Sequence, residues 1–236
     1  MKITYFDDYT GMSNAASNII MEDIKKKPDL FVCAPTGGSP TGLYANLAKE
    51  FISNSSLFDK INILKLDEWG GIPMNDPNSC HSYLLKHVLE PLKIDSSRYI
   101  GFDTTTNNPE AECLRIQKEI DSKSPVDICI LGLGKNGHLG LNEPASSLQK
   151  DCHIAKLTES TLGHSMAQAM HGKPTFGMTV GIGNIMQSKK IIMLITGKDK
   201  QESIKRLLNG EISTMLPASL LWLHSNVECL IDRSSC

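Results

Sequence analysis

The feature that most constrains the fold is the regular alternation of short apolar runs with amphipathic segments along the chain. Apolar runs of about four to eight residues between turn residues are typical of strands, whereas apolar residues spaced three and four apart are typical of helices. The strand-like runs lie at 30–34, 61–66, 126–131, 176–180, 190–196 and 227–231, with a weaker one from Ile154. The helix-like segments lie at 41–52, 81–92, 110–122, 160–170, 198–208 and 217–223. This alternation predicts an α/β fold with a mostly parallel sheet flanked by helices.

Length and charge narrow the class of protein. A chain of 236 residues can form one large α/β domain, and no repeat or long linker divides it, so we expect a single domain over residues 1–236. With 24 Lys and Arg against 26 Asp and Glu and no basic stripe, the sequence does not predict nucleic-acid binding. No stretch approaches about 18 apolar residues, so no membrane span is expected, and the first residues do not look like a signal peptide.

The cysteine and histidine patterns predict no metal site. The seven cysteines include no C-x-x-C pair, and Cys33 and Cys129 lie in apolar runs, where cysteine acts as a small hydrophobe. An odd, unpatterned set of cysteines is typical of a reducing compartment, which predicts a cytoplasmic protein. The seven histidines include no H-x-x-x-H pair. Metal ligands that converge from distant loops remain the alternative.

The stretch 131–144, Leu-Gly-Leu-Gly-Lys-Asn-Gly-His-Leu-Gly-Leu-Asn-Glu-Pro, carries the clearest chemical signal. It follows a strand-like run, and glycines let a backbone turn tightly and lie against a ligand. His138, with Asn136 and Glu143 near it in the loop, is the arrangement expected of proton transfer. The alternative is a core histidine with both ring nitrogens satisfied. The position at the end of a strand favours the functional interpretation.

The same glycines match a second pattern. Gly132, Gly134 and Gly137 fit the G-x-G-x-x-G sequence of dinucleotide-binding proteins. That pattern needs a helix that begins within the glycines, so that its N-terminus meets the pyrophosphate. Gly140 and Pro144 leave room for barely one helical turn. A nicotinamide enzyme is therefore the weaker alternative.

A second glycine loop, Thr-Gly-Gly-Ser at 36–39, follows the strand-like run 30–34 and precedes a helix-like segment. Backbone N–H groups and hydroxyls at a helix start favour an anion. No Gly-Lys-Ser/Thr follows, so the loop predicts a sugar-phosphate site rather than a nucleotide triphosphate site. Lys200, in a later helix, is the candidate counter-charge. The alternative is an ordinary turn with Ser39 as N-cap and Pro40 as the first helical residue.

Two adjacent carboxylates, Asp67 and Glu68, end the strand-like run 61–66 and precede Trp69. Adjacent strand residues point to opposite faces, so one carboxylate is expected to face the site and the other to face away. The alternative is a helix cap or a solvated turn.

Three motifs together resemble the aminosugar-6-phosphate deaminases. They are Pro-Thr-Gly-Gly-Ser-Pro at 35–40, Leu-Asp-Glu-Trp at 66–69 and Gly-Lys-Asn-Gly-His-Leu-Gly-Leu-Asn-Glu-Pro-Ala-Ser-Ser at 134–147. The resemblance implies the α/β fold of glucosamine-6-phosphate deaminase, ribose-5-phosphate isomerase and CoA-transferases, with a mostly parallel, Rossmann-like sheet flanked by helices. Lys-Asn-Gly-His at 135–138 and the tail at 220–226 resemble the galactosamine-6-phosphate deaminase/isomerase branch.

The resemblance implies an enzyme that couples aldose–ketose isomerisation of a hexosamine-6-phosphate to hydrolytic loss of ammonia, without cofactor or metal. Galactosamine-6-phosphate giving tagatose-6-phosphate is the favoured substrate, and glucosamine-6-phosphate giving fructose-6-phosphate is the alternative. His138 matches the ring-opening base, supported by Glu143, and Asp67 matches the base that moves a proton from C2 to C1. The phosphate contacts match Thr36, Gly37, Gly38, Ser39 and Lys200.

The chain departs from the glucosamine-6-phosphate deaminases at two positions. Asn136 stands where that branch carries an aspartate that orients the histidine, which puts more weight on Glu143. A phosphate-binding arginine of that branch falls near Ala167 and is missing. His164 and Lys173 are the candidates to replace it.

Two further functions remain as alternatives. 6-Phosphogluconolactonase is a related hydrolase with a similar glycine–histidine loop, but the Asn-Glu-Pro sequence at 142–144 favours the deaminase. A non-catalytic sugar-phosphate sensor would lack Asp67 or His138, and both are present. The basic residues of the family's allosteric site fall on His153 and Ala155, so activation by an N-acetylated sugar-phosphate is not expected. A homo-oligomer stays open.

Overall fold

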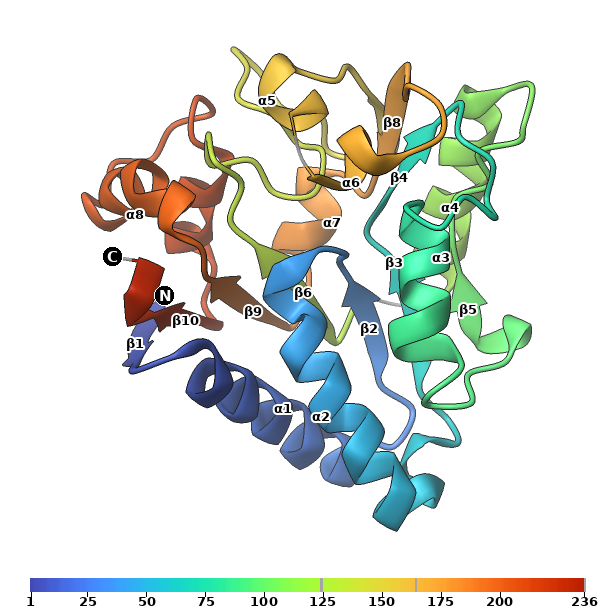
Figure 1. The fold of residues 1–236 in the computed structure, drawn as a ribbon, viewed down its shortest axis with the longest axis vertical. Coiled ribbons are helices and arrows are strands. Elements are labelled where there is room, and N and C mark those ends of the chain that lie inside the picture. Colours follow the sequence, from blue (N-terminus) through green and yellow to red (C-terminus); the bar gives the residue numbers. More distant parts are fainter. Residues whose placement is uncertain (124, 164, 236) are drawn as a thin grey trace.

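A parallel sheet forms the centre of the molecule in the computed structural model, which describes residues 1–123, 125–163 and 165–235 (Figure 1). Within these residues it has seven strands in the order β1-β10-β9-β6-β2-β3-β5, and all neighbouring pairs are parallel. The strands are β1 (Lys2–Phe6), β2 (Phe31–Ala34), β3 (Asn62–Lys65), β5 (Tyr99–Ile100), β6 (Ile128–Gly132), β9 (Lys190–Ile195) and β10 (Val227–Asp232). The predicted single-domain α/β fold with a mostly parallel sheet is confirmed.

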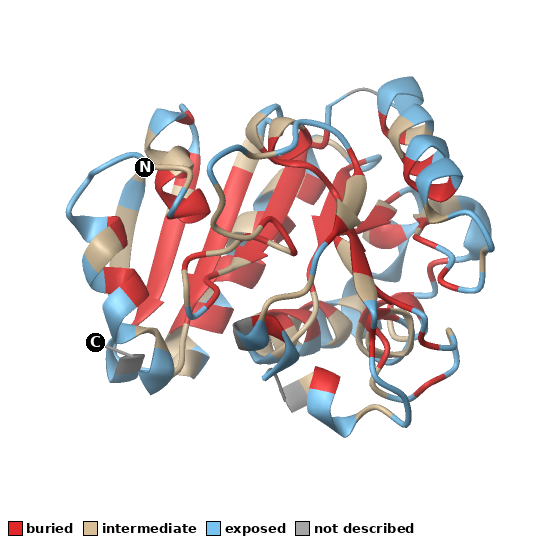
Figure 2. Cartoon of the chain, turned by 90° about the horizontal axis from the view of Figure 1, so that it is seen from above, coloured by how far each residue is buried: buried red, intermediate tan, exposed pale blue. Residues whose placement is uncertain are grey.

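Each face of this sheet packs against its own set of helices. In β6, Ile128 and Ile130 join one core, while Cys129 and Leu131 join the other, because successive side chains of a strand point to opposite faces. The first core packs against α1 (Tyr9–Lys26), α2 (Gly38–Asn54), α3 (Cys80–Leu84) and a π-helical turn (Leu85–Leu89). The second packs against α4 (Pro109–Lys123), α7 (Ile182–Met186), α8 (Gln201–Leu208) and a 3₁₀ helix (Pro217–Leu223). Figure 2 shows the buried strands between helices whose outer sides are exposed.

A smaller antiparallel sheet lies beyond the carboxyl ends of the parallel strands. It consists of β4 (Asp67–Gly70), β8 (Phe176–Thr179) and β7 (His153–Ala155), in the order β4-β8-β7. Only Leu66 separates β3 from β4, so the chain passes directly from one sheet into the other. The segment at 176–180 therefore joins this second sheet, and Asp67 and Glu68 begin a strand rather than end one. Two short helices, α5 (Glu159–Leu162) and α6 (Ser165–Ala169), lie between β7 and β8 (Figure 1).

The start of α2 differs from the alternative considered for the glycine loop. The helix begins at Gly38, and Gly37 is its N-cap with φ 103° and ψ −176°. Ser39 is therefore not the N-cap, and Pro40 is the third helical residue. Glycine reaches a positive φ without the Cβ penalty. Proline is tolerated in a first helical turn because its missing N–H would have no helical partner there.

Other local expectations were incomplete. Leu85 belongs to the helix-like segment 81–92 but is 38% exposed, because the helix widens at this residue into a π-helical turn that shifts the buried face. The single helix expected at 160–170 is divided into α5 and α6, and residue 164 between them lies outside the described residues. The elements β1, α1, β4, β5 and α7 were not predicted. None of the helices in the described ranges is both long enough and apolar enough to cross a membrane.

Candidate active site

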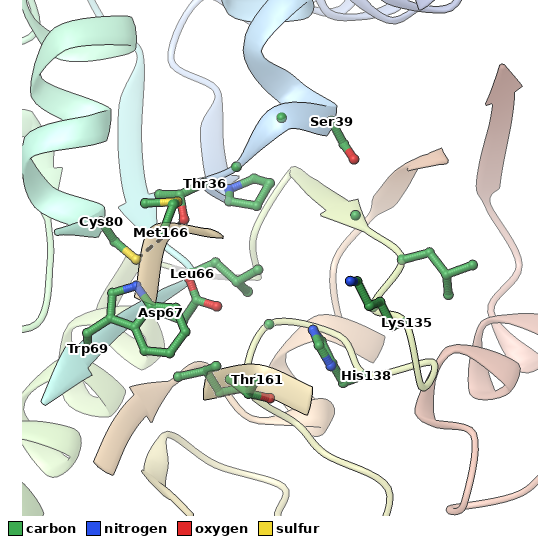
Figure 3. A pocket seen from close by; sticks show the side chains of 18 of the residues that line it. Thr36, Ser39, Leu66, Asp67, Trp69, Cys80, Lys135, His138, Thr161 and Met166 are labelled. Carbon is green, nitrogen blue, oxygen red and sulfur yellow. Dashed lines mark hydrogen bonds between the residues drawn. The ribbon is translucent and has the colours of Figure 1, made fainter. Parts of the chain in front are cut away.

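A pocket opens where the order of the parallel strands reverses. From β2 the chain continues outward through β3 and β5, and from β6 it continues in the opposite direction through β9 and β10. Loops that leave two adjacent strands at such a point diverge and form a crevice at the carboxyl ends of the strands. The pocket has an empty volume of about 870 Å³, open solvent at its mouth included, and is lined by residues of 35–39, 66–69 and 132–141 (Figure 3).

The pocket brings together most of the residues that the sequence singled out. Those that line it are Thr36, Gly37, Gly38, Ser39, Asp67, His138 and Lys200. Asn136 and Glu143 do not line it, but both contact the imidazole of His138. In Figure 3, Asp67 lies on one side of the pocket, and His138 and Lys135 lie on the other.

A hydrogen-bond network fixes the imidazole of His138. Asn136 Oδ1 lies 2.8 Å from His138 Nδ1 and also accepts the backbone N–H of His138 at 3.2 Å. The amide of Asn136 donates through Nδ2 to Glu143 Oε2 at 2.7 Å, so its oxygen must face the ring. Nδ1 therefore carries a proton, and in the neutral ring Nε2 carries the lone pair. The hydroxyl of Thr161 donates to Glu143 Oε1, which lies 3.5 Å from His138 Nδ1.

The packing of Gly134 against His138 accounts for a glycine at this position of the motif, without a bound dinucleotide. The imidazole of His138 lies directly over this residue, and a Cβ placed on Gly134 would be 2.4 Å from ring atom Cγ. The backbone N–H of Gly134 also donates to the carbonyl of His138 at 3.1 Å, which closes the turn. No helix begins within 132–137, so the segment lacks the helix N-terminus that a pyrophosphate site requires.

Asp67 is a half-buried carboxylate whose acidity is strongly reduced. Burial, the larger cause, and the neighbouring carboxylate of Glu68 together raise its pKa to about 7, although Lys65 acts in the opposite direction. A carboxyl group with a pKa near neutrality can both accept and return a proton under physiological conditions. Glu68 points away from the pocket, as adjacent strand residues must.

Beneath Asp67 lies a fully buried ion pair. Lys65 and Glu68 are both 0% exposed, and their charged atoms are 2.6 Å apart. The carbonyl of Phe102 accepts a further hydrogen bond from Lys65 Nζ at 2.9 Å. Glu68 accepts the backbone N–H groups of Cys80 and His81 at 2.9 and 2.7 Å, which are among the unpaired donors at the start of α3. Glu68 thus joins β4 to α3 and holds the strand that carries Asp67.

Two lysines bring positive charge to the pocket. Lys200 lines the pocket, and burial lowers its pKa although Asp199 opposes that effect. Lys135 also lines the pocket, and its ammonium lies 3.0 Å from Asp199. Lys135 was not singled out from the sequence. The only available signal was its position immediately before Asn136 in the glycine–histidine motif.

The position of the missing arginine is apolar in this chain. Ala167 is buried and packs in a small cluster with Trp69 and Cys80, which themselves line the pocket. Of the two suggested replacements, Lys173 is exposed and does not line the pocket. His164 lies outside the described residues.

The described residues contain no group of three His, Cys, Asp or Glu side chains that could hold a metal ion. The arrangement that remains is a carboxylate and an imidazole that share one pocket with a glycine loop and two lysines. This pairing suits movement of a proton on a small anionic substrate.

Fold and pocket together define the class: an α/β protein with a carboxylate and an imidazole in one pocket at the switch point of a parallel sheet. The chain belongs to the family described as glucosamine-6-phosphate isomerases/6-phosphogluconolactonase, whose sequence model matches residues 9–230. The resemblance to the aminosugar-6-phosphate deaminases is thereby confirmed at the level of the family.

Similar proteins carry deaminase names. AgaI of Escherichia coli (strain K12), named as a deaminase, is 38% identical over 226 residues, which cover 96% of this chain and 90% of AgaI. Glucosamine-6-phosphate deaminase 1 of Bacillus subtilis (strain 168) is 37% identical, over 100% of this chain and 98% of that protein. A solved monomeric glucosamine-6-phosphate deaminase of the NagB superfamily superposes with a TM-score of 0.95 at 37% identity, covering 100% of this chain and 98% of that one. A 6-phosphogluconolactonase of Thermotoga maritima shares the fold, with a TM-score of 0.76 at 20% identity over 98% of both chains.

Proposed function

We propose that this protein is a hexosamine-6-phosphate deaminase, which converts its substrate and water to a ketose-6-phosphate and ammonia. The observation that carries the proposal is the joint presence in one pocket of Asp67, with its pKa near 7, and of His138 in a fixed tautomer. The reaction needs two separate proton-transfer steps, and these two groups suit one step each.

The first step opens the sugar ring. In the proposed mechanism, His138 Nε2 takes the proton of the anomeric hydroxyl and returns a proton to the ring oxygen. Asn136 keeps Nδ1 protonated, and Glu143 lies close enough to stabilise the imidazolium that forms between the two transfers. Asn136 is neutral, so the compensating negative charge in this network comes from Glu143.

The second step moves a proton along the open chain. Asp67 removes the proton from C2, the electron pair forms a double bond between C1 and C2, and the carbonyl oxygen at C1 takes up a proton from water, which gives an enolamine. The same carboxyl group then returns the proton to C1 while the amino group gives up a proton to water, which leaves the nitrogen double-bonded to C2. The resulting imine at C2 reacts with water to give the ketone and ammonia. A base with a pKa of about 7 is suited to both directions of this transfer.

The other end of the pocket is proposed to hold the phosphate group. The amides of Gly38 and Ser39 lie in the first turn of α2, where backbone N–H groups have no helical acceptor and the helix dipole favours an anion. Lys200 and Lys135 line the same pocket and are proposed to supply positive charge to the phosphate. A bound phosphate would also favour the charged form of Lys200.

We propose that galactosamine-6-phosphate is preferred over glucosamine-6-phosphate. The support is local: Asn136 stands in place of a negative charge beside His138, and the phosphate-binding arginine of the other branch is absent near Ala167. These differences place the sugar differently, and the C4 hydroxyl distinguishes the two epimers. One buried polar group left unpaired costs about 1–3 kcal/mol, or roughly ten- to a hundredfold in kcat/KM.

Ammonia release should be measured side by side on both hexosamine-6-phosphates, with hydrolysis of 6-phosphogluconolactone as the competing assay. Ammonia from either amino sugar with little lactone hydrolysis supports the reaction class, and the ratio of the two kcat/KM values decides the epimer. A gluco preference would overturn the epimer assignment and leave the reaction class intact. Lactone hydrolysis without ammonia release would overturn the proposed function.

The free cysteines Cys33, Cys80, Cys113, Cys129, Cys152 and Cys229 are all buried. Unpaired thiols of this kind support the proposal of a cytoplasmic location.

A further inference from the structure

Three tyrosine hydroxyls donate hydrogen bonds to backbone carbonyls of the glycine loop. Tyr44 donates to the carbonyl of Pro35 at 2.8 Å, Tyr83 to that of Gly37 at 2.8 Å, and Tyr9 to that of Gly38 at 2.7 Å. The tyrosines come from three different helices: α2, α3 and α1. Three of the five tyrosines in the chain therefore contact this loop.

Each of these contacts also fixes an amide. A trans peptide unit is planar, and its C=O and N–H bonds point in opposite directions; the described residues contain no cis peptide bond. A hydroxyl that holds the carbonyl of Gly37 therefore aims the N–H of Gly38 the other way. In the same manner, Tyr9 sets the N–H of Ser39 and Tyr44 sets that of Thr36. All three of these residues line the pocket.

The loop needs such support because its sequence supplies little stiffness. Gly37 has a positive φ of 103°, and a Cβ at either Gly37 or Gly38 would meet no atom within 4 Å. Adjacent glycines have the widest conformational freedom of any backbone, and the space that a Cβ would occupy here is open. A binding site made of backbone amides gains affinity only if those amides are already aimed at the ligand.

The hydroxyls of Tyr9 and Tyr83 each contact a neighbouring donor, which keeps them oriented as donors to the loop. The hydroxyl of Tyr9 accepts the backbone N–H of Gly42 at 2.7 Å while it donates to Gly38. Thr41 Oγ1 lies 2.7 Å from the Tyr83 hydroxyl and 3.0 Å from the same carbonyl of Gly37. When Thr41 donates to Tyr83, the single proton of the Tyr83 hydroxyl is directed to Gly37. Burial raises the pKa of Tyr83 to about 12, so this hydroxyl keeps its proton throughout the range in which enzymes are assayed.

We propose that Tyr83 and Tyr9 are positioning residues, which preorganise the amides of Gly38 and Ser39 to bind the phosphate group of the substrate. The inference rests on the proposed function in that it assigns the loop to the substrate phosphate. Binding of inorganic phosphate tests it without turnover.

The test uses Tyr83→Phe, which removes one oxygen and keeps the ring that packs edge-on against Tyr44 at 6.4 Å. Tyr99→Phe is the matched control, because its hydroxyl lies 3.4 Å from His81 Nδ1 and makes no contact with the loop. The Kd of inorganic phosphate is measured by titration calorimetry, and KM and kcat on the hexosamine-6-phosphate are measured in parallel. Thermal melting of each variant reports folding.

Loss of one orienting hydrogen bond is expected to weaken phosphate binding about three- to tenfold. KM should rise by the same factor, and Tyr99→Phe should leave Kd and KM at the wild-type values. If Tyr83→Phe does not fold, Tyr9→Phe on α1 must show the same shift. An unchanged phosphate Kd in a folded Tyr83→Phe or Tyr9→Phe variant, or an equal shift in Tyr99→Phe, would overturn the inference. A shifted Kd in a protein that releases no ammonia would support it while the proposed function fails.

Discussion

The ionised form of Asp67 should lower the stability of the folded protein above about pH 7. Burial and Glu68 raise its pKa from 3.8 to about 7, so the folded protein binds this proton more tightly than the unfolded chain does. The stabilisation linked to this proton is complete below about pH 4 and is lost as the pH rises to about 7. Above about pH 7, Asp67 is ionised in the folded protein, where burial and Glu68 disfavour its charge.

The size of this effect follows from the shift. A change of about three pKa units corresponds to roughly 4 kcal/mol, and partial solvation of the half-buried side chain reduces it to about 2–4 kcal/mol. Asp67→Asn keeps the shape but cannot ionise. We therefore expect the variant to be about 2–4 kcal/mol more stable than the wild type at pH 8, with little difference at pH 4.

Urea denaturation of both proteins at several pH values between 4 and 8 measures this difference. Asp76→Asn is the control with the opposite sign: burial alone would raise the pKa of Asp76, but hydrogen bonds from Asn78 and His171 outweigh it and lower the pKa. Its removal should destabilise the protein at high pH. If the difference between Asp67→Asn and the wild type does not grow with pH, the explanation of the raised pKa is wrong.

The other predictions concern activity. Because Asp67 must be ionised to accept a proton, kcat/KM should fall about tenfold per pH unit below pH 7. A pH–rate profile measures this fall, and an acid limb centred near pH 4 would contradict the raised pKa of Asp67. Gly134→Ala should push the ring of His138 by about 1 Å and lower kcat about a hundredfold. Circular dichroism shows whether the variant is folded, and single-turnover kinetics measure the loss of rate in the folded variant. Near-normal turnover would contradict the close contact between Gly134 and the His138 ring. Lys135→Ala should raise KM at least fivefold, whereas Lys198→Ala, at an exposed lysine, should leave it unchanged; equal effects would remove Lys135 from the phosphate site.

Local sequence patterns were enough to predict the parallel sheet and the two glycine loops. Apolar runs such as 126–131 identify strands buried on both faces, and the carboxyl ends of those strands gather at one edge whatever their order. That is why Asp67 and His138 could be expected near each other although 70 residues separate them.

Contacts between distant segments could not be predicted in the same way. The pairing of Lys65 with Glu68 depends on the change from β3 to β4 at Leu66, which no apolar periodicity indicates. Tyr9 and Tyr83 reach the glycine loop from helices 29 and 46 residues away in the sequence. Their spacing carries no signal, because such contacts are set by how helices pack on the sheet.

The central claim is that Asp67 transfers the proton between C2 and C1. The most direct test follows loss of deuterium from C2 of the labelled hexosamine-6-phosphate by nuclear magnetic resonance, with the wild type and with Asp67→Asn. Calorimetry on the same samples measures binding. The wild type should remove the label from C2 during turnover, and Asp67→Asn should leave it in place while it binds the substrate within a few-fold of the wild-type Kd. Loss of the label at the wild-type rate in Asp67→Asn would contradict the account.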